Sequence, residues 1–314
     1  MVDGVADIGL STVLDTLGYA NQLASTLSPA PAPLNVSLVG VRRRVKTASG
    51  LSVPVSMVDR ASRADAIVTP ALGAIVPGAI EAALERSDVR DVGAALIAKS
   101  SENTWIGAAC SATFLLAETG LLDGHNATTS WWLAPLFRQR YPRVTLDDSR
   151  MMVVSAPFVT AGAALAHVDL ALGLVRRRSP ALAALTARYL LVDSRASQAA
   201  YAIPDHLAHA DPMVERFEGW ARRNLAGGFS LVDAAKAIGT SERTLTRRMR
   251  QTLGKSPLGF FQDLRVEHAV HLLQTGHDNI DRVAEQVGYE DGVTLRTLLR
   301  RKLGRSVRDL RSAP

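Results

Sequence analysis

The sequence has one cysteine, no long apolar run and no excess of charge in its first 211 residues. Cys110 alone cannot form an internal disulfide, which agrees with a reducing compartment. No apolar stretch approaches the roughly 18 residues of a membrane-crossing helix, and the N-terminus lacks the basic, apolar and small-residue order of a secretion signal. These absences predict a cytoplasmic protein with no membrane partner. A length of 314 residues suggests two domains of ordinary size.

The positive charge is concentrated near the C-terminus. Residues 212–314 contain 18 Lys and Arg against 12 Asp and Glu, whereas residues 1–211 contain 18 of each. The net charge of +6 therefore lies in the last third of the chain. A local excess of this kind is expected for contacts with phosphates, whereas a basic composition that served only solubility would be spread along the chain.

The same helix-turn-helix pattern occurs twice in this basic segment. The first copy predicts a helix from Leu231 that ends at Gly239, and the second predicts a helix from Ile280 that ends at Gly288. In each copy, apolar residues form one stripe at helical spacing, and the glycine supplies the positive φ that ends the helix. Two copies in register are rarely accidental. The repeat therefore favours DNA binding over a small helical domain of another kind.

The second helix of each copy is predicted to enter the major groove of DNA. In the first copy Ser241 can cap the helix, while Leu245 and Met249 face inward. Arginine can bind guanine through two hydrogen bonds, and threonine can contact the thymine methyl group. The predicted DNA-binding residues are Arg243, Thr246, Arg247 and Arg250 in the first copy, and Gly292, Val293, Thr294, Arg296, Thr297 and Arg300 in the second.

Val283–Asp291 and the tail Arg300–Gly304 resemble the DNA-binding domain of AraC-type transcription regulators. The resemblance covers about residues 212–311. It implies two recognition helices in successive major grooves on one DNA face, joined by a long helix that would be Leu258–Gln274. We expect double-stranded DNA as the partner, with a homodimer and contact with RNA polymerase as further expectations.

Short apolar runs alternate with helical patterns along the first 200 residues. This alternation indicates a parallel sheet covered by helices on both faces. The expected domains are residues 1–192 and 212–314, joined by a linker at residues 193–211. We expect strands at residues 35–41, 66–69 and 104–109, and helices at residues 12–27, 77–84, 111–119, 131–140 and 161–175.

Cys110 lies where an apolar strand meets a helix. Trp105–Ala109 runs into the cysteine, and Ser111 opens the helix that follows. This is a nucleophile-elbow arrangement, which places the side chain beside a helix N-terminus, where a thiolate would be stabilised. A catalytic nucleophile still needs a base within hydrogen-bond reach and a group that orients the base.

Cys110–Leu116, Ala117–Gly124 and Ala127–Thr129 resemble the PfpI-type, class I glutamine-amidotransferase-like domain that is fused to an AraC-type domain in GlxA-like regulators. The resemblance covers nearly all of residues 3–190. It implies an α/β fold with a flavodoxin-like parallel sheet sandwiched by helices, followed by an all-α domain with two helix-turn-helix motifs.

The resemblance implies a catalytic histidine, a carboxylate and an oxyanion loop beside the cysteine, and all three are replaced in this chain. Ser130 stands at the position of the catalytic histidine, Gly9 at that of a carboxylate, and Thr69–Gly73 replaces a glycine-rich oxyanion loop. His125 is close in sequence to Ser130, but its neighbours indicate a turn. We therefore expect that the domain is not an enzyme, that Cys110 is vestigial, and that no cofactor or metal is bound.

The family that this domain resembles opens with an apolar strand before a segment like Asp3–Asp7. This chain begins at Met1 and Val2, so we expect either a late start or the loss of that strand. If the strand is lost, the sheet lacks a member and its stability falls, because a central parallel strand buries apolar surface on both faces.

The sequence thus predicts a DNA-binding transcription regulator that is controlled by a small-molecule effector, or by assembly, through a catalytically degenerate N-terminal domain. The first alternative is a cysteine-dependent hydrolase or amidase with a DNA-binding tail. The second alternative is a regulator whose N-terminal domain serves only as an oligomerisation platform.

Overall fold

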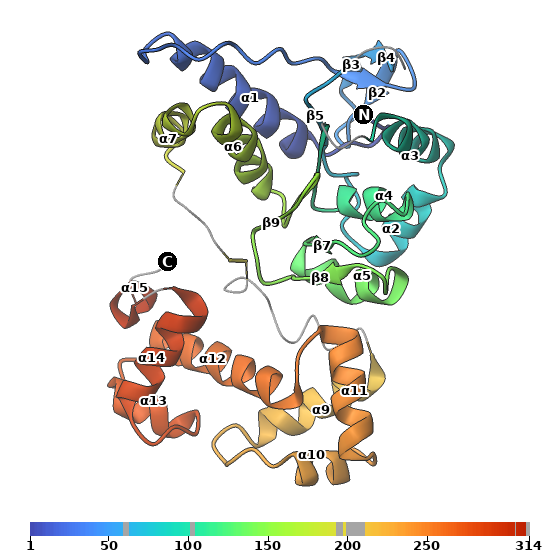
Figure 1. Cartoon of the computed structure of the whole chain (residues 1–314). Coiled ribbons are helices and arrows are strands. Elements are labelled where there is room, and N and C mark those ends of the chain that lie inside the picture. The colour runs from blue at the N-terminus through green and yellow to red at the C-terminus, as the bar shows by residue number, and fades with distance from the viewer. Residues whose placement is uncertain (59–62, 101–103, 193–196, 199–210, 305, 312–314) are drawn as a thin grey trace. The chain divides into compact units, whose positions relative to one another are not determined.

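The computed structural model describes residues 1–58, 63–100, 104–192, 197–198, 211–304 and 306–311. The chain divides into two compact units, Met1–Gln198 and Ala199–Pro314 (Figure 1). The division falls within the expected linker 193–211, of which residues 197, 198 and 211 are described. Pro204, His206 and His209 of that linker lie outside the described residues.

A mixed sheet of four strands forms the centre of the N-terminal unit, in the order β5-β6-β10-β9. β5, β6 and β10 run parallel to one another, while β9 runs antiparallel to β10. Only two residues connect β9 to β10, and so short a connection returns the chain in the opposite direction. The strands are β1 Val39–Gly40, β2 Arg44–Lys46, β3 Ser52–Pro54, β4 Ser56–Met57, β5 Ala66–Thr69, β6 Trp105–Ala109, β7 Asn126–Ala127, β8 Thr145–Leu146, β9 Met152–Ser155 and β10 Phe158–Ala161.

Helices cover both faces of this sheet (Figure 1). The helices of this unit are α1 Asp7–Ala24, α2 Pro77–Leu84, α3 Ser87–Lys99, α4 Ala112–Glu118, the 3-10 helix η1 Trp131–Leu133, α5 Ala134–Arg140, α6 Ala166–Arg178 and α7 Pro180–Tyr189. α1, α6 and α7 pack together around Leu17 and Leu182. The helices α2, α3 and α4 form a second group, which packs around Ile80, Leu96 and Phe114. The predicted α/β sandwich is confirmed, with the correction that its sheet is mixed.

Most of the predicted elements of this unit are present, and several differ in their bounds. The helix expected at residues 12–27 is α1, which begins five residues earlier at Asp7, and the helix expected at residues 131–140 consists of η1 followed by α5. β5 and α2 have the predicted bounds, whereas the strand expected at residues 35–41 is limited to Val39–Gly40 because its partner β4 is equally short. The helix expected from Ala161 begins at Ala166, because Ala161 ends β10. The small apolar residues at this junction suit a buried strand as well as a helix, so their pattern does not locate the boundary.

The first six residues contribute no strand to the described sheet. Val5 forms one isolated bridge with Thr47, and the N–H of Ala6 donates to the carbonyl of Ala71 over 2.9 Å. β5 pairs with β6 alone within the four-stranded sheet. The opening strand expected from the resemblance is therefore absent among the described residues of this sheet.

The C-terminal unit is helical in the part that the structure describes. Its helices are α9 Pro212–Arg223, α10 Leu231–Ala237, α11 Glu242–Leu253, α12 Pro257–Thr275, α13 Ile280–Gln286, α14 Gly292–Leu303 and α15 Val307–Arg311. The long helix predicted at Leu258–Gln274 is α12. Among the helices described in either unit, none is both long enough and apolar enough to cross a membrane.

Candidate DNA-binding surface and cysteine site

The two predicted helix-turn-helix motifs have matching geometry. α10 and α13 are each seven residues long, and α11 and α14 are each twelve residues long. The turn glycines Gly239 and Gly288 have φ values of 73° and 79°, a region that a side chain strongly disfavours. The repeat in the sequence is therefore a repeat in the structure.

Both recognition helices begin and end in the same way. The Ser241 side chain accepts a hydrogen bond from the N–H of Thr244 over 3.2 Å, and Asp291 accepts one from the N–H of Thr294 over 2.7 Å. Each helix ends at a glycine with a left-handed backbone, Gly254 or Gly304. These caps satisfy backbone groups that a helix end leaves unpaired, so the two helices are held in equivalent form.

Leu245 and Met249 are fully buried on the inner face of α11, as predicted, and Leu295 and Leu299 are buried on α14. Most of the predicted DNA-binding residues lie on the opposite faces. Thr246 is half-buried, and the exposed ones are Arg243, Arg247, Arg250, Val293, Thr294, Arg296, Thr297 and Arg300. The structure therefore brings polar side chains together on the outer surface of each recognition helix.

Gly292 does not fit this pattern. It is buried, its N–H donates to a carboxylate oxygen of Asp281 over 2.9 Å, and a Cβ there would lie 2.6 Å from that oxygen. Gly292 thus permits close packing of α14 on α13. The expectation that it contacts DNA is corrected on this ground.

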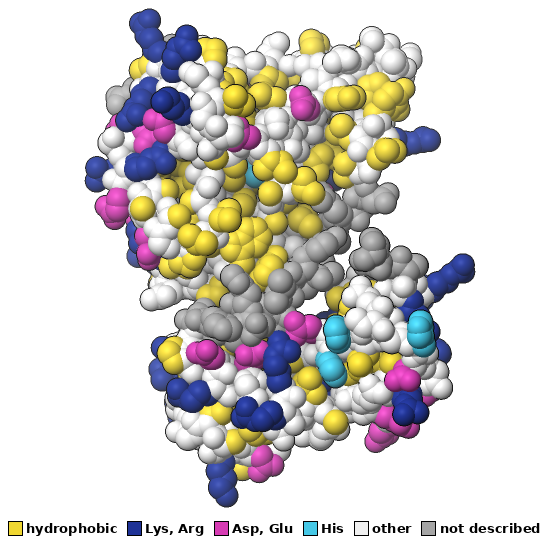
Figure 2. All heavy atoms as spheres, turned by 180° about the vertical axis from the view of Figure 1, so that it is seen from behind, with side chains coloured by type: hydrophobic (Ala, Val, Ile, Leu, Met, Phe, Trp, Pro, Cys, Tyr) yellow, Lys and Arg dark blue, Asp and Glu magenta, His cyan; other side chains and the backbone are white. Residues whose placement is uncertain are grey.

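The arginines predicted to contact DNA differ in their pairing from other cations of this unit, including Arg248 on the same helix α11. Arg222 pairs with Glu218 and Glu267, and Arg248 pairs with Asp211 over 2.6 Å. Arg243 and Arg247 form no ion pair with any residue that the structure describes. Figure 2 shows Lys and Arg side chains over the drawn face of this unit, with Asp, Glu and His side chains among them. Unpaired guanidinium groups on an exposed helix are available for phosphates and base edges.

α12 connects the two motifs through polar contacts that sequence reasoning missed. Asp263 on this helix accepts hydrogen bonds from Lys255, just after α11, over 2.8 Å and from Lys302, near the end of α14, over 2.6 Å. The buried Arg265 donates to the carbonyl of Leu225 over 2.9 Å, and its guanidinium lies 5.1 Å from the ring centre of Tyr289. Both recognition helices are therefore fastened to one rigid element.

In the N-terminal unit, Cys110 occupies the predicted elbow. It follows β6 directly and has a φ of 57°, which is uncommon for a residue with a side chain. Its N–H donates to the carbonyl of Ala161, at the end of β10, over 2.9 Å. The strained turn places the cysteine at the carboxyl edge of the sheet, as in a nucleophile elbow.

Ser130 is the residue that contacts the thiol. Its hydroxyl donates to the Cys110 sulfur over 2.9 Å, which agrees with the position predicted for the missing histidine. Burial raises the pKa of the Cys110 thiol, although hydrogen bonds from Ser130 and Ser111 act in the opposite direction. The expectation of a stabilised thiolate is therefore wrong, because desolvation outweighs these bonds. A serine hydroxyl also cannot act as the base that a thiol nucleophile requires.

His167 fills the space beside Gly9, and the sequence analysis did not identify it. A Cβ at Gly9 would lie 2.6 Å from Nε2 of His167. This nitrogen accepts a hydrogen bond from the N–H of Ala71 over 3.1 Å, so the other ring nitrogen carries the proton and donates to Ala164. Burial lowers the pKa of His167, which keeps the imidazole neutral.

The loop Thr69–Gly73 has its backbone donors engaged within the unit. The N–H of Ala71 donates to His167, and the N–H of Leu72 donates to the Ser111 hydroxyl over 2.9 Å. An oxyanion hole needs such N–H groups directed at the reacting atom. These two groups already have acceptors in the protein.

His125 has partners away from the thiol. Its Nδ1 lies 3.0 Å from the Ser155 hydroxyl, and its ring meets Phe158 edge to face with the centres 4.9 Å apart. Ser130, and not His125, contacts Cys110. No group of three or more potential metal ligands occurs among the described residues.

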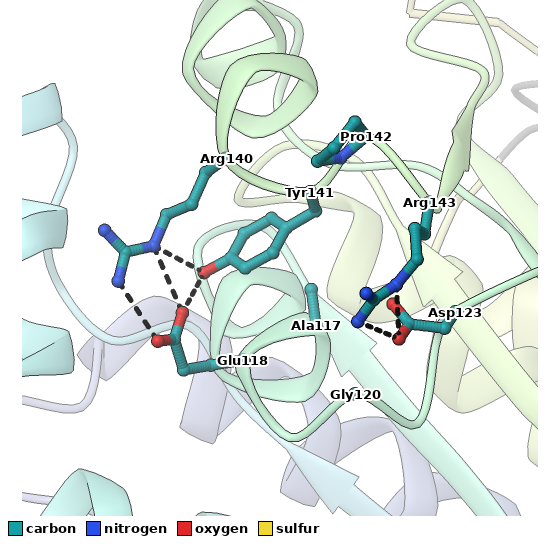
Figure 3. A pocket seen from close by; sticks show the side chains of 8 residues that line it. All are labelled: Ala117, Glu118, Gly120, Asp123, Arg140, Tyr141, Pro142 and Arg143. Atoms are coloured by element: carbon teal, nitrogen blue, oxygen red, sulfur yellow. Dashed lines mark hydrogen bonds and ion pairs between the residues drawn. The ribbon is translucent and has the colours of Figure 1, made fainter.

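A polar hollow of about 470 Å³ lies near the ends of α4 and α5 (Figure 3). The hydroxyl of Tyr141 donates to Glu118 over 2.6 Å, and Arg140 donates to both oxygens of the same carboxylate. The bonds from Arg140 lower the pKa of Glu118. Asp123 pairs with Arg143 over 2.6 Å. The volume suits a small molecule, but the charged side chains that line the hollow are paired with one another.

Comparisons with known proteins agree with both units. Residues 1–177, more than half of the chain, match the DJ-1/PfpI family, and residues 234–313 match a helix-turn-helix domain. The HTH-type transcriptional regulator GbdR of Pseudomonas aeruginosa is 26% identical over 92% of this chain and 76% of its own length. The HTH-type transcriptional regulator GlxA of Rhizobium meliloti is 26% identical over 59% of this chain and 58% of its own length.

The structure of a THiJ/PfpI family protein from Pseudomonas syringae is similar to this chain with a TM-score of 0.50 and 16% identity, covering 76% of this chain and 88% of that one. This likeness shows a shared fold. The chain belongs to the DJ-1/PfpI family and joins that domain to an AraC-type helix-turn-helix domain, so it is a DNA-binding transcription regulator.

Proposed function

We propose that α11 and α14 enter two successive major grooves on one face of duplex DNA. The observation that carries this proposal is the pair of equivalent recognition helices, whose outer faces hold exposed arginines that form no ion pair with any described residue. Arg243, Thr246 and Arg247 read bases in one groove, and Thr294, Arg296 and Thr297 face the other. Arg250 and Arg300 approach the phosphates, and Val293 supplies an apolar contact.

The salt dependence of binding tests this proposal. Each phosphate neutralised by a cation lowers the slope of log affinity against log salt by about 0.9, so several contacts give a slope with a magnitude of roughly 5 or more. Fluorescence anisotropy of a labelled duplex with the full chain, and with residues 205–314, measures this slope. A slope near zero would contradict the proposal.

We further propose that the N-terminal unit senses a small molecule and does not catalyse a reaction. Ser130 replaces a base, burial raises the thiol pKa, and the N–H groups of Ala71 and Leu72 donate within the protein. A positioned base commonly contributes about 10²- to 10⁴-fold to a rate, and an oxyanion donor contributes a similar factor. The N-terminal unit therefore retains the nucleophile elbow at Cys110 but lacks the rate contributions of a positioned base and an oxyanion donor.

One observation favours a second candidate, a cysteine-dependent hydrolase or amidase with a DNA-binding tail. Cys110 retains the left-handed backbone of a nucleophile elbow. Purified full chain, incubated with amide, ester and glyoxal-type substrates, distinguishes the two functions. Turnover that disappears in Cys110→Ser would establish the hydrolase, and equal background rates in both proteins would support the sensor.

Assembly and location complete the proposed function. We propose a cytoplasmic homodimer that contacts RNA polymerase when bound to DNA. Figure 2 shows hydrophobic side chains gathered over one face of the N-terminal unit. Ile75 and Val76, which are 65% and 55% exposed, are among the large hydrophobic residues on the surface of this unit. Exposed apolar area of this kind often marks a protein interface. Sedimentation analysis would show a monomer if this part is wrong.

A further inference from the structure

A hollow of about 600 Å³ opens on the C-terminal unit between the start of α13, one side of α14 and α15. Three arginines line it, of which Arg296 comes from α14, and Arg308 and Arg311 come from α15. All three are exposed, and none forms an ion pair with a residue that the structure describes. Among the lining residues only Asp281 is acidic, so the hollow has an excess of positive charge.

Two of the charged lining groups are held by the protein. A carboxylate oxygen of Asp281 accepts a hydrogen bond from the N–H of Gly292 over 2.9 Å. The guanidinium of Arg311 donates to the backbone carbonyl of Asp278, which holds this side chain against the start of α13. The hydrogen bonds of the described residues leave the guanidinium groups of Arg296 and Arg308 for an external acceptor.

The repeat shows that this charge belongs to the second motif alone. The recognition helices end at Gly254 and Gly304, which are 50 residues apart. The positions 50 residues before the three arginines carry uncharged side chains, namely Thr246, Leu258 and Phe261. Phe261 is fully buried and Leu258 is 46% exposed. The first motif therefore has no cationic hollow at the equivalent place.

The outer face of α14 offers fewer hydrogen-bond donors for bases than that of α11. Val293 and Thr297 stand where the first motif has Arg243 and Arg247, and Val293 is 66% exposed. The Thr297 hydroxyl donates to the carbonyl of Val293 over 3.0 Å, and the Thr294 hydroxyl donates to the carboxylate that caps the helix over 3.1 Å. A hydroxyl hydrogen that is bound within the helix is not available to a base edge.

A phosphate is the occupant that fits this surface. A guanidinium group can donate two parallel hydrogen bonds to phosphate oxygens. Arg296 lies on α14 itself, so the hollow is continuous with the face that is proposed to meet DNA. Contacts with the DNA backbone fix the position of a protein on the duplex without reading its sequence. The charge of the hollow and its place beside the recognition helix therefore favour a phosphate of DNA over an acidic protein segment.

We propose that this hollow binds a backbone phosphate at the edge of the second half-site, with Arg296 and Arg308 as donors and Arg311 as a further positive charge. The second motif thus holds the protein on the DNA backbone, while the first motif supplies most of the sequence preference. This inference rests on the proposed DNA binding and identifies the groups that perform one part of it.

Arg308→Gln in the full chain tests the contact. The loss of one phosphate contact reduces the magnitude of the slope of log affinity against log salt by about 0.9. We also expect affinity to fall by the same factor, severalfold, for a duplex selected from a random pool and for an unrelated duplex, as measured by fluorescence anisotropy. Arg188→Gln is the matched control, because it removes the same charge from an exposed position on α7 of the N-terminal unit; it should keep the slope of the unsubstituted chain.

Duplexes with one neutral methylphosphonate identify the phosphate. They are made from the selected sequence, with the neutral group at each backbone position of the second half-site in turn. At one or two positions the neutral group should weaken binding of the unsubstituted chain severalfold, and this loss should disappear in Arg308→Gln. Arg311→Gln is a second variant and should reduce the loss at the same positions. Melting temperatures show that the variants are folded.

The proposal is overturned if Arg308→Gln keeps the slope of the unsubstituted chain, or if every methylphosphonate has the same effect on both proteins. A loss of affinity that is confined to the selected sequence would also overturn it, because that result indicates base reading. A slope near zero for the unsubstituted chain is a different outcome, since the proposed function then fails together with this inference. A steep slope that both arginine variants retain refutes the phosphate site alone.

Discussion

Asp263→Asn removes the charge that joins both recognition helices to α12. The carboxylate is 16% exposed and lies between Lys255 and Lys302, whose side chains are each 30% exposed. Exposed ion pairs contribute about 0–1 kcal/mol each. Because this carboxylate is largely covered and makes two such pairs, we expect the substitution to lower the free energy of unfolding by about 1–2 kcal/mol.

The larger effect should appear in the spacing of the two half-sites on DNA. One turn of DNA contains about 10 base pairs, so inserting one base pair rotates one half-site by roughly 35° about the DNA axis. A rigid pair of recognition helices must lose one set of contacts, whereas a loosened pair can adjust. We therefore expect Asp263→Asn to reduce severalfold the loss of DNA affinity that the inserted base pair causes.

The assay is competition between the selected site and the same site with one base pair inserted, followed by fluorescence anisotropy. Asp278→Asn is the matched control, because it removes the same charge from an exposed pair with Arg282 whose atoms lie 3.8 Å apart. The reasoning is refuted if Asp263→Asn keeps both the stability and the spacing preference of the unsubstituted chain, or if Asp278→Asn changes the preference equally.

Three other predictions concern single side chains. Arg243→Ala and Arg247→Ala should each weaken specific DNA binding by about 1–3 kcal/mol and relax the base preference, whereas Arg300→Ala should weaken binding to all DNA sequences alike. Selection of binding sites from a random pool measures these preferences. An unchanged base preference in the first two variants would contradict the prediction. Burial lowers the pKa of His167. As pH falls below about 6.5, the imidazole therefore binds a proton in the unfolded chain but stays neutral in the folded chain. The free energy of unfolding should therefore fall in that range by up to about 1.4 kcal/mol per pH unit. Urea titrations of the unsubstituted chain and His167→Gln should differ in this slope, and identical slopes would rule the effect out. Because burial raises the pKa of Cys110, its alkylation by iodoacetamide at neutral pH should be much slower than that of a free thiol, and Cys110→Ser should leave DNA binding unchanged; rapid alkylation would be inconsistent with the buried site.

The C-terminal unit was predictable because its signals are local. Gly239 and Gly288 mark the turns, and the apolar stripes on either side have the period of a helix. Leu245 and Met249 could be placed inside from spacing alone, and both are fully buried. Gly292 was misassigned because the sequence does not reveal that its N–H bonds to Asp281 on the preceding helix.

The site around Cys110 was predictable only in part. The elbow and the position of Ser130 follow from the strand–cysteine–helix order and from the resemblance. His167 reaches Gly9 and Ala71 only through the fold, and no periodic pattern marks it. The balance between desolvation and hydrogen bonding at the thiol depends on how the chain buries Cys110 against Ser130 and Ser111, so the raised pKa could not be inferred from the sequence.

The contact between Gly9 and His167 restricts the routes by which catalysis could evolve in this domain. Any side chain at position 9 would place its Cβ 2.6 Å from Nε2 of the imidazole, so a carboxylate cannot be introduced there while His167 remains. His167 in turn accepts a bond from the N–H of Ala71, and its removal leaves that donor unsatisfied. A path to an active enzyme must therefore pass first through a less stable protein with no gain in activity, and selection for stability alone opposes that first step.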